Sequence, residues 1–250
     1  MRLPLWLNTF YELEALISLS TFAYLNPDYE FPEIEVEKKQ FPLLEAKGLG
    51  HPLIPPDQKI LNDFSINKTG EIVIVTGSNM SGKSTFLRTV GINLCLAFAG
   101  GPVNASCFQV VSFRLFTCIK VSDSVTEGFS YFYAEVKRLK LLLDNLQSKH
   151  VFPLLFLIDE IFRGTNNKER LTGSRSYVRA TTGVNGIGII ATHDLELIKL
   201  EDESGGIRNV HFREDVKNGK MVFDYLLHSG PCPTTNALKI MKMEGLPVDD

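Results

Sequence analysis

One segment constrains the fold of this chain more than any other. The stretch Gly77-Ser78-Asn79-Met80-Ser81-Gly82-Lys83-Ser84 matches the pattern GxxxxGK[ST]. It follows the β-branched run Glu71–Thr76, whose lack of polar alternation predicts a strand buried on both faces of a sheet. A helical pattern of apolar residues comes next and stops at Gly100-Gly101-Pro102. Because a phosphate-binding loop needs a strand before it and a helix after it, this context disfavours a chance match in a turn.

The chemistry of this loop predicts a nucleotide ligand. Its glycines let backbone N–H groups curl around phosphates, and the start of the helix adds the positive end of its dipole. Lys83 is expected to reach the β and γ phosphates, and the Ser84 hydroxyl to ligate Mg²⁺. The residues expected to bind the nucleotide here are Gly77, Ser78, Asn79, Met80, Ser81, Gly82, Lys83, Ser84 and Thr85.

Polar residues also follow two other apolar runs. Asp159-Glu160 comes directly after Leu154–Ile158, and His193 comes directly after Gly188–Thr192. Ligands of open parallel sheets collect at the carboxyl edge of the strands, so these side chains are predicted to lie near the loop. There Asp159 is expected to hold the Mg²⁺ shell, Glu160 to orient the attacking water, and His193 to contact the γ-phosphate or that water. Taken alone, such an acid pair is more often a solvated strand end and a lone histidine more often structural.

Buried strands alternate with helices through the middle of the chain, which predicts an α/β fold. The expected core is a mostly parallel sheet with helices on both faces. Helices are predicted at Leu5–Tyr24, after the loop, at Phe132–Leu146 and at Lys168–Thr181. The smaller expected elements are a β-rich lead-in over residues 27–70 with extended pieces at Ile34–Glu37, Leu43–Lys47 and Ile60–Ile66, one or two strands in Phe108–Val121, a hairpin at Asn218-Gly219 and a last helix at Thr235–Met243.

Composition narrows the classes of protein that this chain can be. The 250 residues carry a formal charge of −3, so there is no global basic field of the kind that coats nucleic acid. Four scattered cysteines suggest neither a disulfide framework nor a zinc site. No apolar run approaches the roughly 20 residues that span a bilayer, and a secretory signal is disfavoured. We therefore expect a cytoplasmic location and no membrane contact.

Several of these motifs together resemble the ATPase domain of the MutS family of DNA mismatch-repair proteins. The resemblance rests on the loop from Thr76 to Thr85, on Asp159-Glu-Ile-Phe-Arg-Gly-Thr165 and on Ala191-Thr-His193. Between them, the stretch from Ser122 to Phe132, together with Glu135, resembles the signature segment of that family. The similarity extends over nearly the whole chain.

This resemblance implies a P-loop ATPase of ABC type that uses ATP and Mg²⁺. It implies a homodimer with composite sites, in which Gly128 and Ser130 of the partner subunit face the nucleotide; Ser130 would also cap its own helix. It implies that Asn79 contacts the γ-phosphate. Residues 1–26 would be the remnant of a core or lever helix and residues 27–250 the ATPase domain. DNA would be bound by domains outside this chain.

The chain departs from the family pattern at a few positions. Ser78 and Ser81 stand where the family has proline and glycine, and Tyr131 replaces a threonine. Lys59 aligns with an aromatic residue that stacks on adenine. Tyr225 is a candidate for the second stacking position, and an ordinary cross-strand aromatic is an equal alternative.

Four functions are compatible with the motifs. The leading one is an ATP-hydrolysing domain whose nucleotide state drives closure of the dimer and of a DNA clamp in mismatch repair. The second is an ABC-type ATPase of the same family that acts on branched DNA, ribosomes or another partner. A small-molecule kinase is disfavoured because no acceptor lid is evident. The last is a nucleotide-binding assembly module without turnover, which a Glu160→Gln variant would distinguish.

Overall fold

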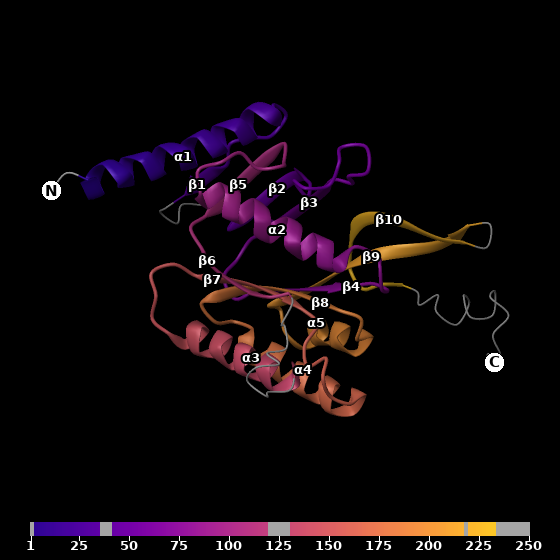
Figure 1. Cartoon of the computed structure of the whole chain (residues 1–250). Helices are drawn as coiled ribbons and strands as arrows, with labels where there is room; N and C mark the ends of the chain where they lie inside the picture. The colour runs from indigo at the N-terminus through magenta and orange to yellow at the C-terminus, as the bar shows by residue number, and fades with distance from the viewer. Residues whose placement is uncertain (1–2, 36–41, 120–130, 218–219, 234–250) are drawn as a thin grey trace. The chain divides into compact units, whose positions relative to one another are not determined.

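The computed structural model describes residues 3–35, 42–119, 131–217 and 220–233 (Figure 1). It consists of two compact units. The first comprises Met1–Ile66 and Thr89–Ser112, and the second comprises Asn67–Arg88 and Phe113–Asp250. Each unit has its own β-sheet, which confirms a mixed α/β fold.

The first unit holds a sheet of four short strands. Their order is β1-β5-β2-β3, with β1 parallel to β5 and the other neighbours antiparallel. The bounds are β1 Glu33–Glu35, β2 Leu44–Leu49, β3 Asn62–Ile66 and β5 Cys107–Val111. These strands confirm the predicted extended pieces before the loop, and β5 lies in the stretch predicted to form one or two strands after it.

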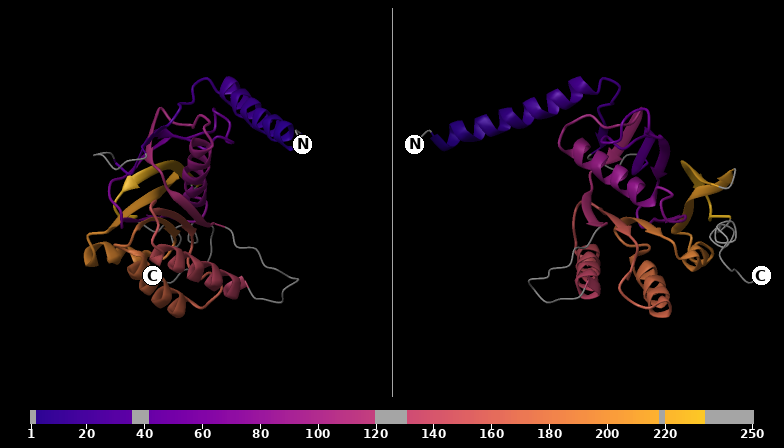
Figure 2. Two further views of the ribbon diagram at one scale, coloured as in Figure 1. Left: turned by 90° about the vertical axis from the view of Figure 1, so that its left-hand side faces the viewer. Right: turned by 45° about the vertical axis from the view of Figure 1, so that its right-hand side comes forward.

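The N-terminal helix of this unit, α1 (Leu3–Leu25), confirms the predicted helix but not the packing of its apolar side chains. None of its described residues is buried, and Phe10, Leu13 and Ile17 are more than half exposed. Figure 2 shows α1 projecting away from the sheet of its own unit. Its C-terminal part packs, where Leu19 lies close to Gly101 and the rings of Phe22 and Tyr29 meet edge-on at 5.7 Å.

The second unit holds a six-stranded sheet in the order β10-β9-β4-β8-β7-β6. All neighbours are parallel except β9 and β10, which confirms the mostly parallel sheet. The bounds are β4 Ile72–Thr76, β6 Arg114–Cys118, β7 Leu154–Asp159, β8 Gly186–Thr192, β9 Ile207–Lys217 and β10 Lys220–Ser229. Every residue of the three predicted central strands is buried, as the apolar runs require.

Helices cover this sheet on both faces. Three of them, α3, α4 and α5, lie on one face (Figures 1 and 2). On the opposite face the ring of Phe86, near the start of α2, packs edge-on against Phe212 of β9. The bounds are α2 Lys83–Phe98, α3 Tyr131–Gln147, α4 Asn167–Thr181, the 3-10 helix η1 Leu195–Lys199 and α5 Leu200–Glu203. The core beneath α3 and α4 includes Ile72, Ile74, Leu139, Leu142, Phe156, Ile158, Tyr177, Val178 and Ile190.

The strand register brings three chain segments to one edge of the sheet. Thr76, the last residue of β4, pairs with Thr192, the last residue of β8. Asp159, the last residue of β7, pairs with Ala191 of β8. The phosphate loop, Glu160 and His193 therefore all begin within one residue of the same level, which confirms their predicted location at the carboxyl ends of neighbouring strands.

The predicted hairpin is confirmed by the antiparallel pairing of β9 with β10. Its turn residues 218 and 219, and the helix predicted at Thr235–Met243, lie outside the described residues. The pairing shifts between Phe223 and Leu227, which takes the intervening residues out of the regular ladder. Among the helices in the described ranges, none combines the length and the hydropathy that a bilayer span needs.

Candidate nucleotide site

The loop after β4 has the backbone that its glycines predict. Gly77 and Gly82 have φ angles of 148° and 110°, which residues with a side chain rarely adopt. A Cβ on Gly77 would lie 2.6 Å from Ser81 Oγ and 2.9 Å from the backbone oxygen of Phe212. Met80 also has a positive φ, of 69°, and its side chain is exposed. The loop is thus wound tightly, and only glycine fits at its first position.

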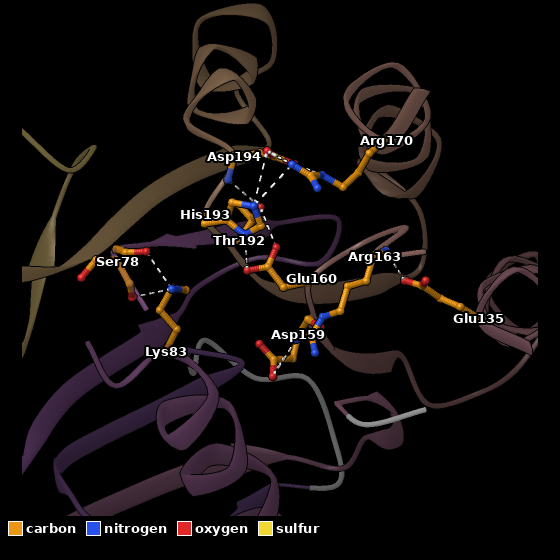
Figure 3. A network of polar contacts seen from close by, with 11 residues as sticks. Ser78, Lys83, Glu135, Asp159, Glu160, Arg163, Arg170, Thr192, His193 and Asp194 are labelled. Carbon is orange, nitrogen blue, oxygen red and sulfur yellow. Dashed lines mark hydrogen bonds and ion pairs between the residues drawn. The ribbon is translucent and has the colours of Figure 1, made fainter. Parts of the chain in front are cut away.

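Lys83 lies folded back into this loop. Its buried side chain places Nζ 2.7 Å from the backbone oxygen of Gly77 and 2.7 Å from that of Ser78 (Figure 3). Burial lowers the pKa of Lys83, and the nearby carboxylates of Glu160, Asp159 and Glu214 oppose that shift. The ammonium group therefore occupies the mouth of the loop, where a phosphate group of a ligand would also meet it.

The other loop residues differ in exposure. Ser84 is half-buried in the first turn of α2, while Asn79 and Thr85 are exposed. Ser81 Oγ is buried and has no hydrogen-bond partner in the described part of the chain. A buried hydroxyl of this kind has spare capacity to bind a polar ligand group or a water molecule.

The two residues of the acid pair, Asp159 and Glu160, lie in different environments. Asp159 is buried, and its Oδ2 lies 3.2 Å from Nη2 of Arg163, which also donates to the backbone oxygen of Asp159 at 2.7 Å. Glu160 turns the other way because its backbone has a left-handed φ of 68°. Its Oε1 lies 2.9 Å from Nδ1 of His193, and its Oε2 accepts a hydrogen bond from Thr192 Oγ1 at 3.4 Å.

His193 is in contact on both sides of its ring. Nδ1 faces Glu160, and Nε2 lies 3.3 Å from Nη2 of Arg170, on α4 (Figure 3). Arg170 in turn holds the carboxylate of Asp194 through two hydrogen bonds of 2.9 Å. The backbone N–H of Asp194 donates to Thr192 Oγ1 at 3.0 Å. A continuous polar chain thus runs from α4 to Glu160.

A buried carboxylate on α3 supports the segment that follows the acid pair. Glu135 Oε1 accepts hydrogen bonds from the backbone N–H groups of Phe162 at 2.6 Å and Arg163 at 3.4 Å. Burial raises the pKa of Glu135, and these backbone hydrogen bonds oppose the rise. Glu135 therefore connects α3 to the backbone that carries Arg163.

Tyr225 lies beside the phosphate loop. Its Cδ1 is 3.3 Å from the position that a Cβ on Gly82 would occupy. It lies where the pairing of β10 with β9 shifts register, and its φ is 54°. Its ring centroid lies 5.8 Å from that of Phe223, and the ring is 44% exposed, so its role in stacking stays a prediction.

Some predicted residues cannot be assigned to this site. Gly128 and Ser130 lie outside the described residues. Lys59 belongs to the first unit, where its Nζ donates to the Tyr29 hydroxyl at 3.0 Å. Those two residues and Asn104, whose Nδ2 also donates to that hydroxyl at 3.0 Å, form a polar cluster of their own.

Sequence reasoning missed Arg170, Asp194 and the supporting role of Glu135. For Glu135 a signal existed, because it lies four and seven residues before Leu139 and Leu142, on the buried face of α3. A carboxylate on an apolar helix face needs donors from elsewhere in the fold. For Arg170 no local pattern distinguished it from Arg175 and Arg179, the other arginines of α4.

Comparison with known proteins gives a consistent result. Residues 73–249 match the family described as MutS domain V. The chain is 27% identical over 242 residues to the DNA mismatch repair protein MutS of Exiguobacterium sp., covering 94% of this chain and 27% of that protein. It is 30% identical over 239 residues to that of Fusobacterium nucleatum subsp. nucleatum, covering 92% and 26%. For Clostridium botulinum the identity is 30% over 246 residues, covering 94% and 25%. The chain thus spans about a quarter of the length of these curated relatives.

Proposed function

This chain belongs to the MutS domain V family, and on that premise we propose that it binds ATP with Mg²⁺ and hydrolyses the bond to the γ-phosphate. One observation carries the proposal. The glycine-rich loop with Lys83, and the carboxylate of Glu160 held by His193, lie at the ends of neighbouring parallel strands. Hydrolysis of a nucleoside triphosphate requires a phosphate cradle and a group that activates water within reach of each other.

The loop supplies the phosphate-binding part. Backbone N–H groups of residues 78–84 and the start of α2 present positive charge to an anion. Lys83 Nζ now lies against two backbone oxygens of the loop. A triphosphate would exchange those neutral acceptors for charged ones, which form stronger hydrogen bonds with an ammonium group. This gain supports Lys83 as a phosphate ligand.

The site also offers the donors that Mg²⁺ prefers. The Ser84 hydroxyl and the Asp159 carboxylate are hard oxygen ligands, and Ser81 Oγ is a buried hydroxyl with no partner in the described residues. Mg²⁺ held by these residues would neutralise negative charge on the phosphates. Arg163 holds the Asp159 carboxylate in place through its ion pair. The residues present therefore fit the metal.

Glu160 is the group that fits the activation of water. Its Oε1 is held by His193, and in the described residues the hydrogen bond of its Oε2 is a long one, 3.4 Å from Thr192 Oγ1. Oε2 can therefore accept a proton from a water molecule that attacks the γ-phosphate. His193 fixes the carboxylate so that this oxygen faces the loop side of the sheet edge. The polarised water is the nucleophile, and Lys83 stabilises the charge on the transferred group.

The relatives support a proposal for the wider role. They are DNA mismatch repair proteins about four times as long as this chain. We place this chain as an ABC-type P-loop ATPase that works as a homodimer, with Gly128 and Ser130 of the partner subunit completing each site. The chain has a formal charge of −3, so DNA contact is assigned to other parts of such a protein.

A Glu160→Gln substitution tests the assignment. The amide keeps the shape of the side chain but cannot accept a proton, so Mg²⁺–ATP binding should persist while steady-state hydrolysis falls at least about 100-fold. Glu203→Gln is the control, because Glu203 is an exposed carboxylate paired with Arg179. Hydrolysis should also rise more than linearly with protein concentration if a second copy completes the site. Undiminished hydrolysis by the Glu160→Gln variant would falsify the assignment of the base.

A further inference from the structure

We propose that Arg170 is a positioning residue of this site, which holds His193 as the Nδ1–H tautomer and thereby orients Glu160. The contacts that set the His193 tautomer are those of the chain without nucleotide. The catalytic consequence rests on the proposed function. Arg170 reaches the site from α4, and the hydrogen-bonded chain Arg170–His193–Glu160 connects it to the proposed base.

The donors in this chain fix where the imidazole carries its hydrogen. A guanidinium group has N–H donors and no acceptor, so Nε2 of His193, 3.3 Å from Arg170 Nη2, must accept. A neutral imidazole has one N–H, which then lies on Nδ1. Glu160 Oε1 is an acceptor 2.9 Å from Nδ1. Both contacts are satisfied by the Nδ1–H tautomer and by no other neutral form.

Arg170 can exert this control because it is itself held. Its Nε and Nη2 each lie 2.9 Å from a different oxygen of Asp194, a two-point contact that fixes the plane of the guanidinium. Asp194 follows His193 directly in the chain, so the same contact fixes the backbone that carries the imidazole. Nη2 is shared between Asp194 and His193, and both contacts depend on one orientation of one side chain.

The burial of this pair separates it from the other ion pairs of α4. The helix forms three arginine–carboxylate pairs, with Asp194, Glu196 and Glu203. The side chains of Arg170 and Asp194 are 15% and 16% exposed, whereas those of Arg179 and Glu203 are 54% and 45% exposed. An exposed pair contributes little to a fixed geometry, and a half-buried, two-point pair contributes more. Arg179 is therefore a matched control on the same helix.

The first test reads the tautomer directly. The chain has five histidines, so two-bond ¹H–¹⁵N correlation spectra of protein labelled with ¹⁵N-histidine are simple, and loss of one signal set in His193→Gln assigns the ring. We expect hydrogen on Nδ1 and a bare Nε2 in the parent protein. In Arg170→Ala, Nε2 should carry hydrogen in a measurable fraction of molecules, while Arg179→Ala should match the parent. Hydrogen on Nε2 in the parent, or unchanged ring signals in Arg170→Ala, would overturn the proposal.

The second test reads catalysis. Arg170→Ala should lower kcat about tenfold or more and leave KM for ATP within about twofold, because supporting residues of a site typically act at this level. Arg170→Lys keeps the charge and the packing of α4 but not the planar fork, and should lose kcat similarly. If a thermal melt shows that Arg170→Ala is unfolded, Arg170→Lys is measured in its place. An unchanged kcat in a folded variant would remove the catalytic part.

The two tests separate this inference from the proposed function. If the parent protein hydrolyses no ATP, the proposed function fails, yet the ring signals of His193 still decide whether Arg170 sets its tautomer. If ATP is hydrolysed and the tautomer is independent of Arg170, only the positioning role fails. Non-additive kcat losses in Arg170→Ala, Asp194→Ala and the double variant would support the two residues acting as one unit.

Discussion

The carboxylate of Glu135 accepts a hydrogen bond from the backbone N–H of Phe162 at 2.6 Å, and thereby ties α3 to the chain just beyond the acid pair. Its other oxygen, Oε2, is buried with no hydrogen-bond partner in the described part of the chain. Burying a carboxylate with one oxygen unpartnered costs stability, and protonation of the carboxyl group reduces that cost.

This relationship predicts a pH-dependent stability. Burial raises the pKa of Glu135 above its ordinary value of 4.5, so the folded chain binds this proton more tightly than the unfolded chain. The stability that the proton contributes is complete below that value and is lost as pH rises through the raised pKa. Urea unfolding of the parent and of Glu135→Gln, from pH 4.5 to 8, should show the parent losing stability relative to the variant. A constant difference across this range would contradict the argument.

The left-handed backbone of Glu160 predicts a conflict between stability and activity. At a φ of 68° a non-glycine residue is strained, and glycine removes the strain. Glu160→Gly should therefore be more stable than Glu160→Ala by about 1 kcal/mol in chemical unfolding. Both variants lack the carboxylate and should lack hydrolysis, so the comparison isolates the backbone. Equal stability of the two would mean that this φ is not strained.

The charge on Lys83 predicts its effect on nucleotide affinity. Lys83→Met keeps most of the buried stem but removes the ammonium group that lies against two loop carbonyls. Hydrogen bonds to charged groups are worth roughly 1.5–3 kcal/mol, so Mg²⁺–ATP should bind about 10- to 100-fold more weakly in calorimetry. Lys68→Met is the control, because Lys68 Nζ also donates to a carbonyl, that of Gly205, before β4 begins. Equal affinities in the parent and Lys83→Met would exclude Lys83 as a phosphate ligand.

The ring of Tyr225 predicts a loss that depends on the base of the nucleotide. If this half-exposed ring stacks on adenine, Tyr225→Ala should weaken ATP binding about tenfold, while Tyr225→Phe should bind like the parent. Inorganic triphosphate has no base, so its affinity should not change. If Tyr225→Ala weakened both ligands alike, the ring would instead support the loop through its contact near Gly82.

The parts of the fold that the sequence predicts well are those in which one local pattern has one physical solution. Short apolar runs precede the loop, Asp159 and His193. Their length and lack of alternation favour buried strands, and all three are strands. Because these strands alternate with helices along the chain, a parallel sheet is expected. Parallel strands place their carboxyl ends at one edge of the sheet. The grouping of Lys83, Glu160 and His193 follows from topology and requires no long-range knowledge of side chains.

Other features depend on contacts that no local pattern encodes. The apolar residues of α1 have helical spacing, but spacing does not say what they pack against, and none is buried among the described residues. For Tyr225 the sequence left two interpretations open, because it does not reveal the register shift of β10 between Phe223 and Leu227. Arg170 and Asp194 lie 24 residues apart and meet only because α4 packs beside the end of β8.

The pairing of Thr76 with Thr192, and of Asp159 with Ala191, sets the relative positions of the strand ends that carry the site. A slip of one residue would move a strand end by about 3.3 Å, more than any hydrogen bond between Glu160 and His193 could follow. The connections that join these strands through the helices set no such distance. At the opposite edge of the sheet, connections such as residues 148–153 between α3 and β7 carry none of the site residues, so insertions should be tolerated there and not in the strands.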